Sequence, residues 1–317
     1  MAISTQPLIP ASSRPPSRVA IRKAVDYGGE LAGIVSETLR EFRLPVAGKS
    51  VLLKPNLVQP DPGNLINTHP AVIAAAREAF LRLGASPVVI AEGPGHERDV
   101  EGILETIRLR DWVGRLDGQF VDLNLDEVRP VNLRTRASKL RRLFLPVAVL
   151  EADLVVSLPK MKTHHWAGVT LSLKNLFGTV PGSCYGWPKN VLHWAGIENS
   201  ILDLSTTLRP DFSIVDGIVA MEGNGPIQGT AKAAGVLVMG DDPVAVDATA
   251  ARVMGLVPER IGYLQKAGYA LGNVSAEKIQ QIGESLEETR TPFTVLEQFR
   301  RLVEHSQSGT AGRKGIA

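Results

Sequence analysis

Residues 153–175 read DLVVSLPKMKTHHWAGVTLSLKN, and this stretch decides the fold class. Its first part is a short apolar run rich in β-branched residues, which is typical of strands that are buried on both faces of a sheet. The part that follows, residues 159–175, contains three lysines and two adjacent histidines. The sequence therefore predicts a buried strand that leads directly into a cluster of basic side chains.

Other apolar runs along the chain have the same character, and stretches with helical periodicity separate several of them. The runs lie at residues 19–24, 51–55, 87–93, 212–220 and 235–241, and the helical stretches at 68–84, 99–109, 190–208 and 242–254. The unit from residue 51 to residue 93 predicts a βαβ crossover, which is right-handed in nearly all known cases. We therefore predict an α/β fold in which helices flank a mainly parallel or mixed sheet.

The chain divides into one predicted domain and two loose ends. We expect a flexible N-terminal arm at residues 1–17, a single α/β domain at 18–304 and a flexible tail at 305–317. Residues 120–134 read as antiparallel or edge strands, so a small β-rich subdomain is expected to be inserted at about residues 115–150. The stretch from Pro258 onward, including FTVLEQFRRLVEH, predicts helices on the outside of the domain.

Composition excludes several classes of protein. The 317 residues are 44% hydrophobic and 21% charged, as expected of a globular protein with a full core. A net charge of +2 provides no global field for nucleic acid or an anionic membrane, and no uncharged apolar run is long enough to span a bilayer. The single cysteine, Cys184, excludes an internal disulfide and fits a reducing cytoplasm, so we expect a cytoplasmic protein without nucleic-acid or membrane partners.

Ionisable residues next to Gly or Pro follow each of the main predicted strands. They are Lys54 with Asn56, Glu92 with His96, the segment 160–165, Asp216 with Glu222 and Asn224, and Asp241 with Asp242. In open α/β sheets ligands bind outside the carboxyl ends of the strands. The sequence therefore predicts a polar crevice at this edge of the sheet.

The lysines and histidines of this crevice are candidates for anion binding and proton transfer. A lysine can hold a carboxylate or phosphate, and an imidazole titrates near neutral pH, where neighbouring lysines lower its pKa. The candidate catalytic residues are His164, His165, Lys160 and Lys174, and the candidate substrate-binding residues are Lys54, Asn56, Lys162, Asn175, Gly223 and Asn224. The alternatives are solvated surface lysines and packing of His165 against Trp166. His193 is expected to have a structural role and Trp194 to pack in the core.

A divalent metal ion is a second expectation for the crevice, with Glu92, Asp216, Glu222 and Asp242 as its candidate ligands. This expectation rests on convergence in three dimensions, because the chain has no local spacing such as His-Glu-x-x-His. The glycine-rich loops match neither G-x-G-x-x-G nor G-x-x-x-x-G-K-[ST]. A dinucleotide site and a P-loop nucleotide site are therefore disfavoured.

Several separate blocks, in order, resemble the bacterial and archaeal family known as domain of unknown function 362. The blocks are KPN, SLPKMKTH, LSLKNLFG, DGIVAMEGNGP and GDDPVAVDATAARVMG, within residues 48–256. The resemblance implies a shared core with motif positions at Lys54, Asn56, Lys160, Lys162, His164, Lys174, Asn175, Asp216, Glu222, Asn224, Asp242 and Asp247. Some relatives carry a ferredoxin-like segment with cysteine clusters. With Cys184 alone, this chain is not expected to ligate an iron–sulfur cluster.

Three hypotheses for function follow. The first is an enzyme that binds a small anionic carboxylate or phosphate and uses Lys and His acid–base chemistry, with metal assistance as an option. The second is a redox-partner or cofactor-binding protein that works with a separate ferredoxin-type protein. The third is a binding protein in which the lysines capture an anion and nothing reacts. The resemblance itself supplies no reaction.

Overall fold

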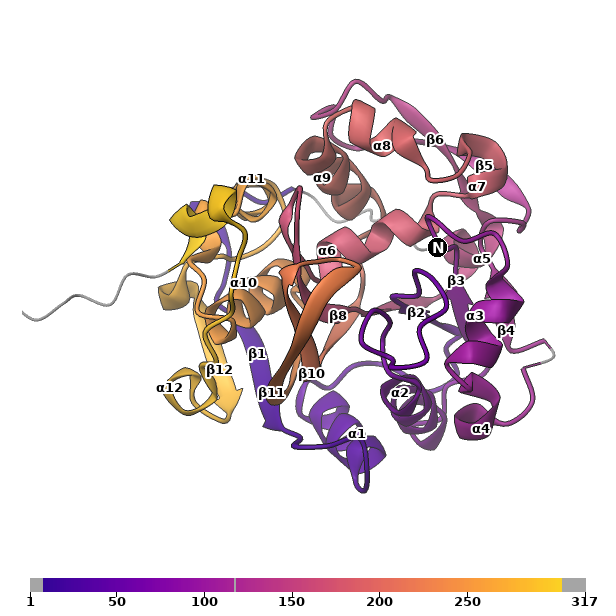
Figure 1. Cartoon of the computed structure of the whole chain (residues 1–317), viewed down its shortest axis with the longest axis horizontal. Helices are drawn as coiled ribbons and strands as arrows, with labels where there is room; N and C mark the ends of the chain where they lie inside the picture. The colour runs from indigo at the N-terminus through magenta and orange to yellow at the C-terminus, as the bar shows by residue number, and fades with distance from the viewer. Residues whose placement is uncertain (1–7, 117, 304–317) are drawn as a thin grey trace, which may run out of the picture.

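The computed structural model describes residues 8–116 and 118–303, and within them a ten-stranded mixed sheet forms the centre of the molecule (Figure 1). The strands are β1 Ser17–Lys23, β2 Val51–Pro55, β3 Val88–Glu92, β4 Phe120–Asp122, β7 Leu154–Leu158, β8 Lys160–His164, β9 Gly168–Thr170, β10 Phe212–Asn224, β11 Gln228–Gly240 and β12 Ile279–Gly283. The main path runs in the order β12, β1, β11, β10, β7, β2, β3, β4, and β8 and β9 lie off it.

Parallel strands make up the half of the sheet that positions the site. β4, β3, β2, β7 and the first residues of β10 are parallel neighbours, whereas β10 with β11 and β11 with β1 are antiparallel. The register places Leu53 of β2 opposite both Ile90 of β3 and Val156 of β7. The predicted α/β class with a mixed sheet is confirmed.

The basic segment after β7 is itself a strand, β8. Pro159 separates β7 from β8, because proline has no N–H to donate to a ladder. The long strand β10 continues past this break, pairing with β7 at Phe212 and then with β8 at Asp216. Consequently Lys160, Lys162 and His164 occupy alternate positions on one strand, although its register with β10 shifts between Asp216 and Met221.

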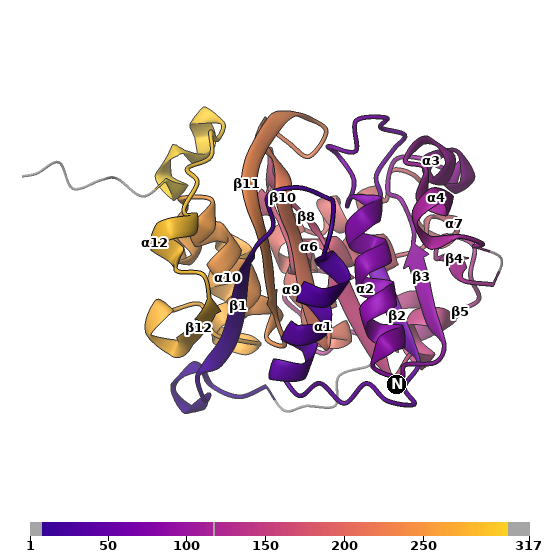
Figure 2. The same ribbon diagram turned by 90° about the horizontal axis from the view of Figure 1, so that it is seen from below.

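Helices cover both faces of the sheet. On one face lie α1 Leu31–Glu41, α2 Pro70–Arg82, α3 Val100–Thr106 and α4 Leu109–Val113, and Figure 2 shows α1 and α2 side by side over the strands. The opposite face carries α5 Val147–Glu151, α6 Ser172–Asn175, α9 Ile197–Leu208, α10 Pro243–Val253 and α11 Gly262–Ala270. Shorter helices are α7 Gly182–Tyr185, α8 Asn190–Trp194 and α12 Leu286–Thr289.

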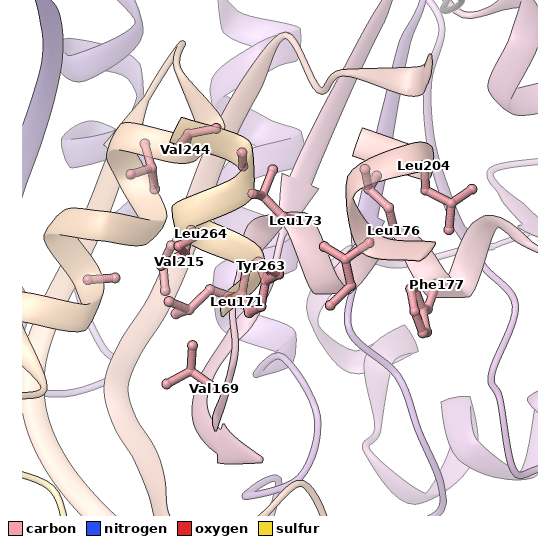
Figure 3. Packing of buried hydrophobic residues seen from close by; sticks show 14 of the residues in the cluster. Val169, Leu171, Leu173, Leu176, Phe177, Leu204, Val215, Val244, Tyr263 and Leu264 are labelled. Carbon is pink, nitrogen blue, oxygen red and sulfur yellow. The ribbon is translucent and has the colours of Figure 1, made fainter. Parts of the chain in front are cut away.

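Successive residues of the strands enter different cores, as the alternation of side chains along a strand requires. Leu52 belongs to the apolar cluster under α9 and α10, and its neighbour Leu53 to the cluster under α1 and α2. Figure 3 shows the first cluster from close by, with Leu173 and Leu176 among the buried residues. A short segment of chain around α6 is thereby fixed in the core.

A second, small sheet lies within the stretch that was predicted to be β-rich. β5 Val128–Asn132 and β6 Arg142–Pro146 form a separate two-stranded antiparallel sheet, while the nearby β4 is an edge strand of the main sheet. The turn between β5 and β6 is bound to the buried carboxylate of Asp203 on α9, which accepts from Thr135, Ala137 and Ser138. The insertion is therefore fastened to the domain by hydrogen bonds as well as by packing.

The two ends of the described chain differ from the expectation. Arg14 is 7% exposed and donates to the carbonyls of Ile9 and Tyr269, so this side chain fastens the predicted arm to α11 although residues 8–13 are exposed. Residues 279–283 form β12, and residues 297–302 form a 3₁₀ helix in place of the predicted α-helix. Residues 1–7 and the predicted tail 305–317 lie outside the described residues.

None of the helices in the described ranges combines the length and the apolar character needed to cross a membrane.

Candidate functional site

A cavity of about 360 Å³ lies where the carboxyl ends of β2 and β3 face the end of β8. Of the predicted site residues, those that line it are Asn56, Glu92, Lys162, His164, His165, Lys174, Asn175 and Asn224. Leu57, Val58, Phe177 and Ile227 supply apolar wall. The predicted crevice at the strand ends is therefore a concave site of the size that binds a small molecule.

A buried ion pair forms the floor of the site. Lys54 at the end of β2 and Glu92 at the end of β3 are 0% and 1% exposed, and their Nζ and Oε2 atoms are 2.6 Å apart. Glu92 also accepts from the backbone N–H groups of Leu57 and Gly93 at 2.9 and 2.8 Å. Burial lowers the pKa of Lys54, and the charge of Glu92 opposes that effect.

Asn175 and Gly178 complete the floor. The Asn175 amide donates to the carbonyl of Lys54 at 2.9 Å and to Ser157 Oγ at 3.1 Å, so α6 is joined to two strand ends. A Cβ atom on Gly178 would lie 2.0 Å from Glu92 Oε1 and 2.4 Å from Lys54 Nζ. A side chain at this position would therefore displace the ion pair, and glycine permits the close approach of the backbone.

The short helix α6 presents Lys174 to the cavity, and Asp247 holds that helix from behind. Asp247, on α10, is fully buried and accepts from the backbone N–H groups of Ser172 and Leu173 at 2.7 and 3.0 Å. Burial raises the pKa of Asp247 to about 8, and these two hydrogen bonds act in the opposite direction. With Asn175 also anchored, the backbone of Lys174 is fixed on both sides.

Three lysines reach the cavity without a carboxylate partner among the described residues. Lys162 donates to the carbonyl of Ile66 at 2.7 Å, and Lys189 donates to the carbonyl of Gly93 at 2.5 Å. Lys174 has its Nζ 3.9 Å from the centroid of the Phe177 ring. Burial lowers the pKa of Lys174 and of Lys189 to about 7, and burial with nearby lysines lowers the pKa of Lys162.

His164 and His165 are held in opposite tautomers. His164 Nδ1 accepts from the backbone N–H groups of Trp166 and Ala167 at 3.0 and 3.2 Å, so its proton lies on Nε2. His165 Nδ1 lies 2.9 Å from the carbonyl oxygen of Gly225 and must donate to it, which leaves the lone pair on Nε2. The turn at residues 165–167 brings the two rings to a stacked arrangement with centroids 5.0 Å apart.

The sequence interpretation missed two of the lining residues. His193 was expected to have a structural role, but it lines the cavity, where burial and Lys174 lower its pKa to about 4. Lys189 was not selected, because its segment GWPKN returns to the site only through the turns at α7 and α8. His96, which follows the predicted strand end at Glu92, also lines the cavity, and burial and Lys174 lower its pKa.

Lys160, predicted as catalytic, lies outside the cavity in a second buried ion pair. Its Nζ is 2.9 Å from Asp216 Oδ2 and donates to the Tyr27 hydroxyl at 2.8 Å, while Tyr27 donates to Asp216 Oδ1 at 3.1 Å. The His69 ring stacks on Tyr27 with centroids 3.6 Å apart. This network joins the N-terminal segment to β8 and β10, and within it the charges of Lys160 and Asp216 neutralise each other.

The four carboxylates suggested as metal ligands are not brought together. Glu92 and Asp216 are in separate ion pairs, Glu222 contacts Lys232 on the β10–β11 hairpin, and Asp242 accepts from the first turn of α10. Among residues 8–116 and 118–303, no group of three or more His, Cys, Asp or Glu side chains is arranged to hold a metal ion. The described residues therefore do not form the metal site that the sequence suggested.

The aromatic residues near the site separate into different roles. Trp166 lines the cavity, and its ring meets the His165 ring edge-on with centroids 4.7 Å apart. Trp194 was expected in the core, and this was wrong, because its side chain is 80% exposed. Gly223, a predicted binding residue, lies on the hairpin and does not line the cavity.

Comparison with known proteins matches most of this chain. The family described as Domain of unknown function (DUF362) matches residues 51–252, which span the strands and helices that build the cavity. The thylakoid-associated protein sll1697 of Synechocystis is 31% identical over 247 residues, covering 73% of this chain and 73% of that protein.

Two solved structures show weaker likeness. The lactate racemase apoprotein of Thermoanaerobacterium thermosaccharolyticum matches with a TM-score of 0.40 and 17% identity, covering 64% of this chain and 51% of that one. A protein of Thermotoga maritima matches with a TM-score of 0.38 and 12% identity, covering 69% of this chain and 57% of that one. This chain thus spans about half the length of the racemase chain, and at these scores neither likeness bears on its chemistry.

The buried pair at the floor of the cavity leads to a prediction about stability. Glu92→Ala leaves the Lys54 ammonium buried without a counter-charge, so we expect the free energy of unfolding to fall by about 3–5 kcal/mol. The double variant Lys54→Met/Glu92→Leu removes both charges and is expected to lose less. Urea denaturation followed by circular dichroism measures both.

The exposed pair of Glu78 and Arg82 provides the control, because both side chains are more than half exposed. Glu78→Ala is expected to change the midpoint of unfolding little. If Glu92→Ala were as stable as the wild type, the pair of Lys54 and Glu92 would not stabilise the fold.

The assignment of the two tautomers can be measured directly. We expect ¹⁵N NMR of the histidine side chains to find, in the neutral form of each ring, the proton on Nε2 of His164 and on Nδ1 of His165. His69 is an internal reference, because its Nδ1 accepts from the N–H of Ala71 and must also be unprotonated. Variants His164→Gln and His165→Gln assign the signals, and the same tautomer for both rings would contradict the assignment.

Proposed function

For this chain, which belongs to the DUF362 family, we propose an enzyme that binds a small carboxylate or phosphate and moves a proton with the histidines at the end of β8. The observation that carries the proposal is the charge of the cavity. Lys162, Lys174 and Lys189 approach it without carboxylate partners in the described chain. Glu92 is the one carboxylate among its described lining residues, and Lys54 neutralises it.

A bound anion would supply the negative counter-charge that these lysines lack. An ammonium group loses solvation when it is buried, and it regains favourable interaction energy when an anion takes the place of water. Asn56 adds a polar group at the cavity wall, and its Oδ1 is buried without a hydrogen-bond partner in the structure. These features favour a ligand that has a carboxylate or phosphate group together with a donor such as a hydroxyl.

The histidines divide the work of proton transfer. His165 has its lone pair on Nε2, and that atom makes no hydrogen bond with a described residue, so it is suited to accept a proton from the ligand. His164 presents an N–H at Nε2, and its role is to donate a hydrogen bond to an oxygen that gains negative charge. Proton transfer at a carbon beside the carboxylate uses both functions, while the lysines stabilise the resulting anion.

The location of the protein belongs to the same proposal. The single cysteine supports a cytoplasmic location, and the relative sll1697 is thylakoid-associated. We infer that this chain works at the aqueous side of a membrane or in the cytoplasm, where a small anion reaches the cavity from water.

We expect anion affinity to depend on pH in a defined direction. In the empty cavity Lys174 and Lys189 have pKa values of about 7, and a bound anion raises them. Below pH 7 both lysines carry their charge before binding, and above it each must take up a proton. Sulfate affinity is therefore expected to fall by roughly tenfold per pH unit for each such lysine. Calorimetry from pH 6 to 9 measures this, because sulfate keeps its charge over that range.

Lysine variants control this measurement. Lys174→Met and Lys189→Met are each expected to weaken sulfate binding about 10- to 100-fold and to reduce the proton uptake. Lys139→Met changes an exposed lysine and leaves both quantities unaltered. Sulfate binding that is weak at every pH and equal in all four proteins would refute the anion site.

Exchange of carbon-bound hydrogen distinguishes an enzyme from a binding protein. In D₂O the wild type is expected to accelerate exchange at the α-carbon of at least one of glycolate and malonate, followed by proton NMR. His165→Gln removes the base and should slow that exchange at least about 100-fold, while sulfate binding persists. If wild-type protein binds these anions and exchanges none of them, the cavity belongs to a binding protein.

A further inference from the structure

Lys174 differs from the other lysines at this edge of the sheet. Lys54 and Lys160 are paired with carboxylates, and Lys162 and Lys189 donate to backbone carbonyls. Lys174 makes no hydrogen bond or ion pair with the described residues, and its Nζ lies against the face of Phe177. Its amine is thus the group of this set that is left unengaged at the cavity surface.

We propose that Lys174 is a nucleophile that forms an imine with the carbonyl group of a small oxo acid bound in this cavity. The inference rests on the proposed anion site and goes further, because it names the substrate class and a covalent intermediate. The carboxylate of the oxo acid would lie against Lys189 and Lys162, and its carbonyl carbon against Lys174.

The amine must be uncharged to attack a carbonyl, and its surroundings favour that form. Burial is the larger effect and the charge of Lys54 the smaller one, and together they lower the pKa of Lys174 to about 7. An exposed lysine has a pKa near 10.4, so only about one in a thousand is uncharged at pH 7.4. Desolvation beside another cation is a known way of activating a lysine amine.

The position of the amine is set by contacts on both sides of it. Asp247 fixes the backbone N–H groups of Ser172 and Leu173, and the Asn175 side chain is bound to Lys54 and Ser157. Leu173 is fully buried in the core cluster. A nucleophile on so constrained a backbone keeps its orientation when the substrate arrives, which is what an efficient attack requires.

The neighbouring histidines allow a balanced reaction. The Lys174 nitrogen forms a bond to the carbonyl carbon, and the carbonyl π electrons move to oxygen, where His164 Nε2–H donates a hydrogen bond. The nitrogen loses two protons, and His165 Nε2 carries each in turn to the oxygen. The first converts the oxyanion to a hydroxyl group, and the second lets that hydroxyl group leave as water. The products are an imine and one water molecule, with no oxidant or reductant.

Reductive trapping tests the proposal on the full-length protein. Pyruvate and sodium cyanoborohydride convert an imine to a stable secondary amine, and peptide mass spectrometry locates it. We expect one dominant adduct, on Lys174, that forms faster than adducts on exposed lysines such as Lys139. Lys174→Arg has no primary amine that can form the imine, so it should lose this adduct while labelling of Lys139 in the same variant stays at the wild-type rate.

Each outcome has a separate meaning. If the wild type binds sulfate but pyruvate labels Lys174 no faster than Lys139, the imine proposal fails and the anion site stands. If the wild type binds neither sulfate nor pyruvate, both proposals fail. An adduct that persists in Lys174→Arg at the wild-type rate also overturns the assignment, and circular dichroism of the variant establishes that it is folded.

Discussion

The ion pair between Lys54 and Glu92 is the contact on which the site depends. It joins the ends of two neighbouring parallel strands, and through the N–H groups of Leu57 and Gly93 it also fixes the loops that follow them. Two charges are buried at a cost that only close pairing and further hydrogen bonds offset. Because this pair consumes the charge of Glu92, the lysines that reach the cavity remain unbalanced.

The helix α6 connects the apolar core, the ion pair and the cavity. Within four residues it places Leu173 in the apolar cluster, Lys174 at the cavity and Asn175 on the ion pair. The residue types at positions 247 and 178 are required by the same arrangement. Asp247 accepts hydrogen bonds from the backbone of the helix, and Gly178 has no side chain that would collide with the ion pair. A change at either position would therefore act on Lys174 without touching the ligand.

The sequence was sufficient to predict the sheet and part of the site. The features that it did not predict were missed for physical reasons. The strand at residues 51–55 was predicted at its observed bounds, because the apolar run Val51–Leu53 is typical of a strand buried on both faces and Lys54 with Pro55 marks its end. Lys160 was placed in the site in error: β7 and β8 are separate strands, and the partner Asp216 lies 56 residues further on. Pairing across such a separation depends on strand register, which the local pattern does not specify.

Residues reached through irregular segments were the least predictable. Lys189 has a positive φ of 54° and lies next to a Trp-Pro pair, so its direction is set by turns rather than by the period of a helix or strand. His193 looked structural because it lies near the start of the predicted helix at residues 190–208. His164 and His165 could be located, because they follow a strand, but their tautomers depend on acceptors and donors supplied by the turn and by Gly225.

The combination of buried lysines and missing carboxylates separates this cavity from an ordinary basic surface. An exposed lysine stays charged at neutral pH and attracts any anion weakly through solvent. In the cavity the lysines Lys174 and Lys189 are near their pKa, so the charge state follows the ligand: an anion draws in protons, and its departure releases them. A lysine in such a site can bind an anion in its charged form and act as a nucleophile in its uncharged form. We propose both roles for Lys174.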